Sequence, residues 1–523
     1  MSVIHNPILK GFYPDPSVLR VGEDYYIATS TFEWFPGVTI LHSRDLCHWE
    51  TLKAPLCDDR MLDLRGIDTS CGIWAPSLTY SDGIFYLVYT IVYTDRPRFK
   101  DTHNFVVTAE NVEGPWSKPV FLNCSGFDPS LFHDDDGRKW LVNMTVDQRP
   151  SKERFGGIVL QEFDAEEQKL IGPVYPIFPG TEIGKTEGPY MYHHNGWYYL
   201  VCAEGGTEGG HCCTVARSKS IAGPYETHPQ NPVLTSRADD DYPIQRAGHG
   251  SLIETQNHEW LMAHLCSRPL SGCSILGRET AFQNVEWTDD GWFRVVSTKG
   301  KLPMTEFKVN GLPETRFPKS LTRENFDTAE LPCEFLTLRQ SPEHCGISLN
   351  ERPGCLRIYG GNSLSSKYRQ GLAARRQQDF SCDCETCVEF EPAAYQQMAG
   401  LVCYYNYDNY YYLKIGFDED LGKCISVTSV VNREVTETEP VPVPQGTEKI
   451  FLKAEIRGEA LQFYGSKDAE EYCTVGGKYD MKNLSDERVN GNGFTGAMVG
   501  VCCQDLSGRG IFADFDWFEY KAI

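Results

Sequence analysis

Three acidic residues stand at matching places in short motifs that recur along the chain. Asp15 and Asp128 each begin an Asp-Pro-Ser triplet, and Glu187 begins Glu-Gly-Pro. Like charges brought within a few ångströms of each other raise the pKa of at least one group, so one carboxyl can stay protonated near neutral pH. A protonated acid opposite an ionised base is the arrangement that cleaves a glycosidic bond. One Asp-Pro-Ser alone is ordinary turn chemistry, but several motifs in one register favour a functional set.

These motifs belong to a segment that recurs five times. The copies begin 60, 53, 60 and 61 residues apart, and each has a short apolar strand, a polar turn and a strand rich in Tyr, Trp and Val. That pattern is typical of a β-hairpin. Weaker aromatic segments follow four of the hairpins and are expected to be outer edge strands, at 43–50, 109–117, 218–226 and 282–289. Four strands per unit, repeated five times, predict a five-bladed β-propeller.

The propeller explains how residues far apart in sequence can meet. The innermost strand of each blade starts near the central axis, so equivalent positions of the five repeats form one ring. Glu187 lies one residue before its place in the ring. Three carboxylates and a histidine would therefore face one shallow pit. The five ring positions are Asp15, Ala75, Asp128, Gly188 and His249.

The chain of 523 residues is long enough for two or three domains. The blades occupy residues 1–305, and a stretch with Pro and Gly, 306–320, is expected to be a linker. Residues 321–523 form short alternating segments without helical periodicity, which predicts a jelly-roll β-sandwich, so the fold class is all-β.

Composition limits the classes of partner. The net charge of −23 disfavours nucleic acids and anionic membrane surfaces, and a 12% share of aromatic residues suits a neutral sugar. The first residues do not look like a secretory signal, and no apolar run reaches the roughly 20 residues that span a bilayer. We therefore expect a cytoplasmic protein whose 20 cysteines are mostly reduced.

The chain resembles glycoside hydrolase family 43, specifically its two-domain β-xylosidases, over essentially its whole length. The motifs that carry the resemblance in the first domain are GFYPDPS (11–17), WAPS (74–77), GFDPSLF (126–132), KTEGPYMY (185–192), GHGS (248–251) and GRET (277–280). In the second domain they are FTGAMVG (494–500) and ADFDWFEY (513–520).

The resemblance implies an exo-acting inverting 1,4-β-xylosidase that releases xylose from the non-reducing ends of xylooligosaccharides. It implies Asp15 as general base, Glu187 as general acid, and Asp128 as the residue that orients the acid and keeps its pKa raised. No cofactor is required, no nucleic-acid or membrane partner is implied, and a homo-oligomer, dimer or tetramer, is expected.

The same resemblance suggests the residues that bind the sugar. Phe32, Trp74 and Phe127 are expected to form the walls of the pocket, with Thr207 as a weaker candidate and Arg278 as the cation that bonds sugar hydroxyls. Phe494, on a Gly-rich loop of the second domain, could close the pocket or lie in the sandwich core. Val146 stands where related enzymes often carry Trp, which leaves the preferred chain length open.

His249 has three interpretations. It could hydrogen-bond Asp15, face a divalent cation such as Ca²⁺ or a water cluster on the axis as in some family members, or be a hydrogen-bonded core histidine. No other metal site is predicted. The triplets Asp134–Asp136 and Asp239–Asp241 are better explained as a turn and a loop, and Cys382, Cys384 and Cys387 by strand alternation.

Three alternative functions stay open at this stage. An α-L-arabinofuranosidase would use the same chemistry on a sugar with similar hydroxyl geometry. A retaining fructosidase also has a five-bladed propeller, but FYPDPSV does not resemble its nucleophile motif. A non-catalytic sugar-binding protein with the same two domains would have no need of a carboxyl that is held protonated.

Overall fold

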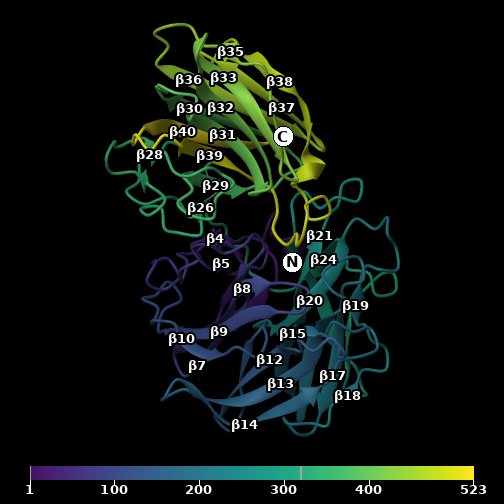
Figure 1. Ribbon diagram of the computed structural model, residues 1–523. Helices are drawn as coiled ribbons and strands as arrows, with labels where there is room; N and C mark the ends of the chain where they lie inside the picture. Colours follow the sequence, from purple (N-terminus) through teal and green to yellow (C-terminus); the bar gives the residue numbers. More distant parts are fainter. Residues whose placement is uncertain (1, 319–320) are drawn as a thin grey trace.

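The computed structural model describes residues 2–318 and 321–523. Residues 319 and 320, at the end of the predicted linker, lie outside the described part. Figure 1 shows two β-rich domains stacked on each other, with the N-terminal domain below and the C-terminal domain above. In the described part of the chain, no helix is long and apolar enough to cross a membrane.

The N-terminal domain is a five-bladed β-propeller, as predicted. Each blade is an antiparallel sheet whose strands follow the order of the sequence, and the fourth blade carries β19 as an extra strand. The strands are β2 (Ser17–Val21), β3 (Asp24–Thr29), β5 (Thr39–Ser43) and β6 (Glu50–Thr51) in the first blade; β7 (Gly72–Ser81), β8 (Ile84–Asp95), β9 (Lys100–Ala109) and β10 (Val120–Asn123) in the second; β11 (Ser130–His133), β12 (Lys139–Val146), β13 (Phe155–Asp164) and β14 (Lys169–Phe178) in the third; β15 (Glu187–His194), β16 (Trp197–Glu204), β17 (Cys212–Ser218), β18 (Glu226–Thr227) and β19 (Leu234–Thr235) in the fourth; and β20 (Gln245–Glu254), β21 (Trp260–Ser267), β22 (Glu279–Trp287) and β23 (Phe293–Val295) in the fifth.

The five ring positions share one unusual backbone conformation. Their φ angles are 54°, 34°, 53°, 56° and 52°, in the left-handed region that residues other than glycine seldom adopt. Only one of the five is a glycine. The repeated conformation supports the register that the sequence predicted, because the chain makes the same turn at the start of each blade. The residues are Asp15, Ala75, Asp128, Gly188 and His249.

The expected outer edge strands were wrong in detail. The segment 282–289 belongs mostly to β22, the third strand of the fifth blade, and the outermost strand there is β23. In the second blade, residues 109–117 are a turn that precedes the edge strand β10. Their aromatic residues mark the turn that leads to an edge strand more often than the strand itself.

The two ends of the propeller segment are joined by a strand pair. β1 (Ser2–His5) pairs antiparallel with β24 (Glu306–Val309), with Ser2 opposite Val309. Residues 306–309 of the predicted linker are thus extended chain paired with the N-terminus. The backbone near Leu9 also bonds that of Thr280 in β22, so the N-terminal segment is held against the fifth blade.

The C-terminal domain is a concanavalin-like jelly-roll sandwich of two antiparallel sheets, joined by a buried core. It contains one short 3₁₀ helix, η1 (Met481–Leu484). The first sheet has the order β27 (Ile347–Ser348), β28 (Leu356–Tyr359), β40 (Phe512–Ala522), β30 (Ser381–Glu389), β36 (Lys449–Arg457), β37 (Ala460–Ser466) and β38 (Cys473–Asp480), with β25 (Arg323–Glu324) beside β40; the second has the order β34 (Glu434–Glu437), β33 (Gly422–Val431), β32 (Asn409–Asp418), β31 (Gln397–Asn406), β39 (Met498–Asp505), β29 (Leu372–Arg376), β26 (Phe335–Leu338) and β4 (Trp34–Phe35), with β35 (Val441–Pro442) beside β33.

The two domains share both a sheet and a core. β4 lies in the connection between β3 and β5 of the first blade, yet it pairs with β26 at the edge of the second sandwich sheet. One cluster of buried apolar side chains includes Trp34 and Phe35 of the propeller segment and Leu338 and Tyr404 of the sandwich. Because apolar surface continues across the boundary, the sandwich is fixed on the propeller rather than tethered to it.

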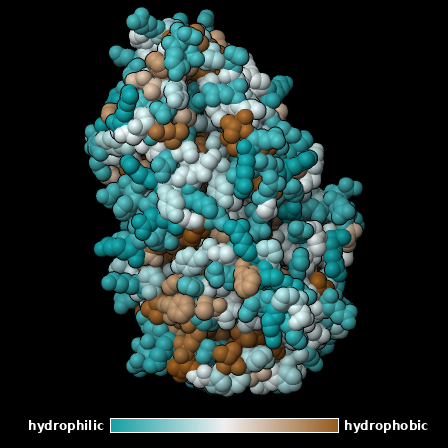
Figure 2. All heavy atoms as spheres, in the orientation of Figure 1, coloured by the Kyte–Doolittle hydropathy of each residue, from teal (hydrophilic) through white to brown (hydrophobic). Residues whose placement is uncertain are grey.

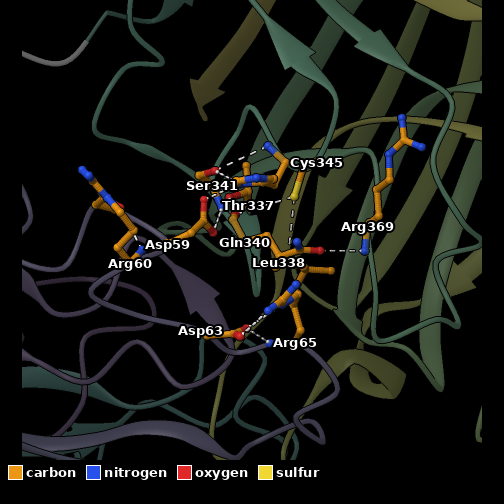
Figure 3. Close-up of polar contacts among 12 residues, drawn as sticks. Asp59, Arg60, Asp63, Arg65, Thr337, Leu338, Gln340, Ser341, Cys345 and Arg369 are labelled. Carbon is orange, nitrogen blue, oxygen red and sulfur yellow. Dashed lines mark hydrogen bonds and ion pairs between the residues drawn. The ribbon is translucent and has the colours of Figure 1, made fainter.

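Polar contacts border this shared core (Figure 3). The carboxylate of Asp59, on the propeller loop after β6, accepts hydrogen bonds from the backbone N–H of Ser341 at 3.0 Å and from Nδ1 of His344 at 2.6 Å. Arg339 donates from Nε to the carbonyl of Ile67 at 2.7 Å.

The face of the molecule in Figure 2 is largely hydrophilic, with apolar residues gathered mainly over the propeller.

Candidate active site

A cavity of about 500 Å³ lies between the propeller and a loop of the sandwich. Residues of all five blades contribute to its wall, together with residues 486–487 and 491–494 of the sandwich. The structure brings together every residue that the sequence singled out for catalysis or sugar binding. These are Asp15, Phe32, Trp74, Phe127, Asp128, Glu187, Thr207, His249, Arg278 and Phe494.

Asp15 is buried and fully engaged by hydrogen-bond donors. Ser30 donates from its hydroxyl to Oδ2 at 2.7 Å, and Arg278 donates from Nη1 to Oδ1 at 2.9 Å. Nδ1 of His249 lies 3.8 Å from Oδ1. The Ser30 hydroxyl also accepts a bond from the backbone N–H of Ala75 at 2.7 Å, so two neighbouring ring positions are linked through one side chain.

These partners set the ionisation of Asp15. Burial raises the pKa of this carboxyl. The positive charge of Arg278, the nearby His249 and the hydrogen bond from Ser30 together lower the pKa by more than burial raises it. The pKa of Asp15 therefore lies below its ordinary value, and the group is a carboxylate at neutral pH.

Asp128 and Glu187 have the opposite tendency. Burial and the charges of Glu187 and Asp15 raise the pKa of Asp128 well above its ordinary range. Burial raises the pKa of Glu187 to about 7, with Lys100 acting against the rise and Asp15 adding to it. Two buried carboxyl groups that disfavour each other's ionisation hold a proton between them near neutral pH.

Gly188 lies between these two groups. Its backbone N–H donates to Oδ2 of Asp128 at 3.0 Å. A β-carbon at this position would lie only 2.9 to 3.1 Å from the imidazole ring of His249. The ring position of the fourth blade is therefore a glycine for lack of space, and the acidic side chain of this blade comes from the preceding residue, Glu187.

Aromatic rings form one wall of the cavity. The centroid of the Trp74 ring lies 5.5 Å from that of Phe127, 5.5 Å from that of Phe494 and 5.8 Å from that of Phe32. Trp74 is fixed by a bond of 3.0 Å from its indole N–H to the carbonyl of Ser70. Such edge-to-face rings are rigid and present apolar faces and edges that suit the carbon side of a sugar.

Phe494 lies in the cavity wall rather than in the sandwich core. Its ring packs against the core cluster that the two domains share. Its backbone N–H donates to the Ser70 hydroxyl at 3.2 Å, and its carbonyl accepts a bond of 3.1 Å from Nη2 of Arg278. The loop that carries it, coloured yellow, descends from the sandwich to the propeller in Figure 1.

Comparison with known proteins decides the family. The family "Glycosyl hydrolases family 43" matches residues 4–293, and the "Beta xylosidase C-terminal Concanavalin A-like domain" matches residues 323–521. The chain belongs to glycoside hydrolase family 43. It is therefore a glycoside hydrolase with the family's C-terminal domain.

Relatives match this family 43 chain from end to end. A xylosidase/arabinosidase 43B of Humicola insolens is 46% identical, covering 100% of this chain and 98% of its own. A xylan 1,3-beta-xylosidase of a Vibrio species is 44% identical, covering 99% of both. The crystal structure of a xylan beta-1,4-xylosidase from Bacillus halodurans C-125 has a TM-score of 0.97 and 51% identity, covering 99% of this chain and 100% of that one.

Several residues of the family 43 cavity had no signal in the sequence. Lys100 lies 4.1 Å from the centroid of the Trp74 ring and 4.4 Å from that of Phe127, and its Nζ is 3.4 Å from Asp95. Asp95 also accepts a bond of 2.7 Å from Arg154 of the third blade. Burial lowers the pKa of Lys100, while Asp95 favours its charged form. These residues lie at hairpin ends outside the repeated motif.

An aromatic ring on the strand beside Val146 lines the cavity. Val146 is the last residue of β12 and pairs with Phe155, the first residue of β13. Phe155 lines the cavity, and its ring centroid is 6.4 Å from that of Phe127. The aromatic wall thus continues on the neighbouring strand. The pattern of apolar and polar residues along β12 alone could not predict this position for Phe155.

The weaker motifs have structural explanations. Asp134–Asp136 is the turn between β11 and β12, and Asp239 forms an ion pair with Lys299 in a loop. Cys382, Cys384 and Cys387 are buried in β30. Within residues 2–318 and 321–523, no group of three or more His, Cys, Asp or Glu side chains could hold a metal ion.

The surroundings of His249 do not fit a cation site built by the protein. Its Nδ1 faces Asp15, and burial lowers its pKa, so the imidazole is neutral near pH 7. Its buried Nε2 has no hydrogen-bond partner among the described residues, but His249 and Asp15 are not joined there by a third His, Cys, Asp or Glu side chain into a group that could hold a metal ion.

Proposed function

We propose that this family 43 enzyme is an exo-acting, inverting 1,4-β-xylosidase that removes xylose from the non-reducing ends of xylooligosaccharides. The observation that carries the proposal is the opposite ionisation of buried carboxyl groups in one cavity. Asp15 has a lowered pKa, and the pKa of Glu187 is raised to about 7. One group is then an ionised base and the other a protonated acid at the same pH, as glycoside hydrolysis requires.

In the proposed reaction, Glu187 donates its proton to the glycosidic oxygen as the bond to the anomeric carbon breaks. Asp15 takes a proton from a water molecule, whose oxygen attacks the anomeric carbon from the opposite face. The products are xylose of inverted configuration and a shortened chain. Asp128 does not react; a hydrogen bond from the Gly188 N–H fixes its place beside Glu187, where the charges of Glu187 and Asp15 raise the pKa of Asp128.

The closed shape of the site supports exo action. The cavity is bounded by carboxylates on the propeller axis, by the ring of Trp74 and by Phe494 from the other domain. A volume of about 500 Å³ suits a short oligosaccharide end rather than the middle of a long chain. Arg278 and His249 both line the cavity, where their side chains can bond sugar hydroxyls.

Two other substrate specificities are supported by the names of relatives, and both are therefore included in the test. The relative from Humicola insolens is named for both xylosidase and arabinosidase, and that from Vibrio for a 1,3 linkage. An α-L-arabinofuranosidase activity would use the same carboxyl groups. We propose β-1,4-xylosidase as the main activity because the B. halodurans enzyme, at 51% identity, is a xylan beta-1,4-xylosidase.

The test is a timed product analysis. The enzyme is incubated with β-1,4-xylobiose, β-1,4-xylotriose and β-1,3-xylobiose, and separately with 4-nitrophenyl β-D-xyloside and α-L-arabinofuranoside. We expect xylose from the 1,4-linked substrates at the highest kcat/KM, and α-xylose as the first anomer in proton NMR. First-formed β-xylose would exclude an inverting mechanism. A protein that binds xylobiose without cleaving it would be a sugar-binding protein instead.

The proposal extends to the oligomeric state, the location and the cofactor requirement of the enzyme. We propose that the enzyme acts as a homodimer or homotetramer, which light scattering coupled to size-exclusion chromatography would measure. We propose that it works in the cytoplasm on imported oligosaccharides, and that it needs no added cofactor. Activity that survives dialysis against a chelator is expected, and a strict requirement for Ca²⁺ would contradict the last statement.

A further inference from the structure

The loop of residues 485–497 crosses the cavity and is anchored on both sides. Asn492 donates to Oδ2 of Asp95, in the second blade, at 2.6 Å. On the opposite side, the backbone N–H of Ala497 donates to the carbonyl of Ile275, in the fifth blade, at 2.9 Å. At Gly277 an added β-carbon would lie 2.1 Å from the carbonyl of Thr495, so the two backbones touch. The loop is thus a strap across the mouth of the site.

A buried charge cluster holds the start of this strap. Oδ2 of Asp486 lies 3.4 Å from Nη1 of Arg246, and Tyr405 donates from its hydroxyl to Oδ1 at 2.5 Å. The neighbouring Glu487 forms an ion pair with the same guanidinium and accepts a bond of 2.8 Å from the backbone N–H of Ser274. Only 5% of the Asp486 side chain and 12% of the Arg246 side chain are exposed.

Arg246 ties this cluster to the propeller axis. It stands three residues before His249 in β20, with a φ of 57°. Its carbonyl accepts a bond of 3.0 Å from Nδ1 of His211, and the ring of His211 packs against Gly248. The guanidinium that binds the strap therefore belongs to the strand that carries a ring residue.

The far end of the strap reaches the general base. The carbonyl of Phe494 accepts a bond from Nη2 of Arg278, whose Nη1 binds Asp15. The Phe494 N–H bonds Ser70, whose carbonyl holds the indole of Trp74. One backbone position of the sandwich thus supports the cation beside the base and the ring in the wall.

We propose that Asp486 is a positioning residue of the active site, which acts through Arg246 and the strap to hold Arg278 against Asp15. This inference rests on the proposed function, because it assigns Asp15 the role of base. The second domain then contributes to the ionisation of the base as well as to the closure of the pocket. Asp486 itself does not touch the reacting atoms.

The contacts of Asp486 explain why one side chain matters. Burial raises the pKa of Asp486 to about 7, so at the acidic pH where Asp15 titrates this carboxyl is protonated and holds Arg246 and Tyr405 by hydrogen bonds. Removing the side chain leaves the buried guanidinium with Glu487 alone and a weaker hold on the strap. Misplacement of a catalytic constellation by about 1 Å can cost on the order of 100-fold in rate. A looser Phe494 carbonyl would let Arg278 move away from Asp15, and the carboxylate would lose the stabilisation of an adjacent positive charge.

The test compares Asp486→Ala with the matched change Asp420→Ala, at an exposed position of the sandwich. The pH dependence of kcat/KM is measured with 4-nitrophenyl β-D-xyloside for both variants and the wild type. For Asp486→Ala, which removes the contacts with Arg246 and Tyr405, we expect kcat/KM to fall roughly 10- to 100-fold. We also expect the acidic limb to move up by about one pH unit as Arg278 moves away from Asp15, since an opposite charge near a carboxyl is worth 1–3 units. Asp420→Ala should behave as the wild type.

A purely structural role of Asp486 would lower activity without moving the acidic limb, and that result would overturn the proposal. The variant Arg246→Lys, which keeps the positive charge, serves if Asp486→Ala does not fold; a shift of the acidic limb smaller than about one unit is expected there, and an unmoved limb rejects the proposal. A wild type that does not cleave xylosides refutes the proposed function, whereas an active wild type with an unchanged Asp486→Ala variant refutes this inference alone.

Discussion

Arg278 donates from Nη1 to Oδ1 of Asp15 over 2.9 Å, and 4% and 7% of the two side chains are exposed. This buried pair sets the pKa of Asp15 apart from those of Asp128 and Glu187 in the same cavity. Without the guanidinium, burial would raise the pKa of Asp15 as it raises those of its neighbours. The site thus makes one base and one acid from chemically similar groups by placing the guanidinium of Arg278 beside Asp15.

The first prediction concerns this pair. In Arg278→Gln, the pKa of Asp15 should rise, so the base becomes protonated at a higher pH and the acidic limb of kcat/KM moves upward. Because the sugar also loses a cation, kcat/KM should fall by at least 100-fold. The measurement is a pH–rate profile with 4-nitrophenyl β-D-xyloside. An acidic limb at the wild-type position would show that Arg278 does not set the ionisation of Asp15.

The second prediction concerns the alkaline side of the wild-type profile. The acid must be protonated to donate, so activity is lost as the pH rises through the pKa of Glu187, which is about 7. The base must be ionised, so activity is lost at low pH only below the lowered pKa of Asp15. We therefore expect a bell-shaped kcat/KM with its descending limb near pH 7. A descending limb above pH 9 would contradict the assignment.

The third prediction distinguishes the acid from the base. In Glu187→Ala, hydrolysis of xylobiose should fall by roughly 100- to 10,000-fold, because its leaving sugar needs a proton. A xyloside with a good leaving group, such as 2,4-dinitrophenol, needs little protonation and should lose far less. The matched control is Glu182→Ala, an exposed residue of the preceding loop. Equal losses with both substrates would exclude Glu187 as the acid.

The fourth prediction concerns the sandwich ring in the wall. Phe494→Ala removes a ring whose centroid lies 5.5 Å from that of Trp74 and 6.1 Å from that of Phe32. Aromatic contacts of this kind are worth about 0.5–1.5 kcal/mol each, so we expect KM for xylobiose to rise roughly tenfold with a smaller change in kcat. Phe121→Ala, at an exposed ring outside the cavity, is the control. An unchanged KM would mean that Phe494 does not contact substrate.

Much of the site was predictable because the fold is repetitive. A motif in register five times places residues on one axis, so Asp15, Asp128 and His249 could be assigned to a ring before any coordinates were known. The family motifs added Trp74 and Arg278. The ring residues could be predicted because each stands at the same place in its repeat, at the start of the innermost strand.

The rest depends on contacts between segments without a shared register. Lys100 and Arg154 come from hairpin ends, and their place in the cavity follows from the length of those hairpins. Asp486 comes from a loop that meets Arg246 only after the sandwich has docked. Neither residue type nor spacing distinguishes it from the many exposed acidic residues of a chain with a net charge of −23.

The last prediction concerns the stability of a buried ion pair at the start of β22, in the fifth blade. Arg268 binds the buried carboxylate of Glu279 with two hydrogen bonds, of 2.8 and 2.7 Å, and Glu279 also accepts a bond of 3.1 Å from the backbone N–H of Gly11. Because Glu279 has no exposed surface, Arg268→Ala leaves a buried acidic group without its cation. Breaking such a pair costs about 3–5 kcal/mol, so the midpoint of urea unfolding should fall markedly.

The matched control is Arg294→Ala, which breaks an ion pair with Glu286 of similar length, 2.7 Å, on the surface. Two-thirds of the Arg294 side chain is exposed, and such pairs contribute about 0–1 kcal/mol, so its unfolding midpoint should stay near that of the wild type. The double variant Arg268→Ala/Glu279→Gln should recover part of the loss, since no unpaired charge remains. Equal effects of Arg268→Ala and Arg294→Ala would show that burial does not set the strength of the inner pair.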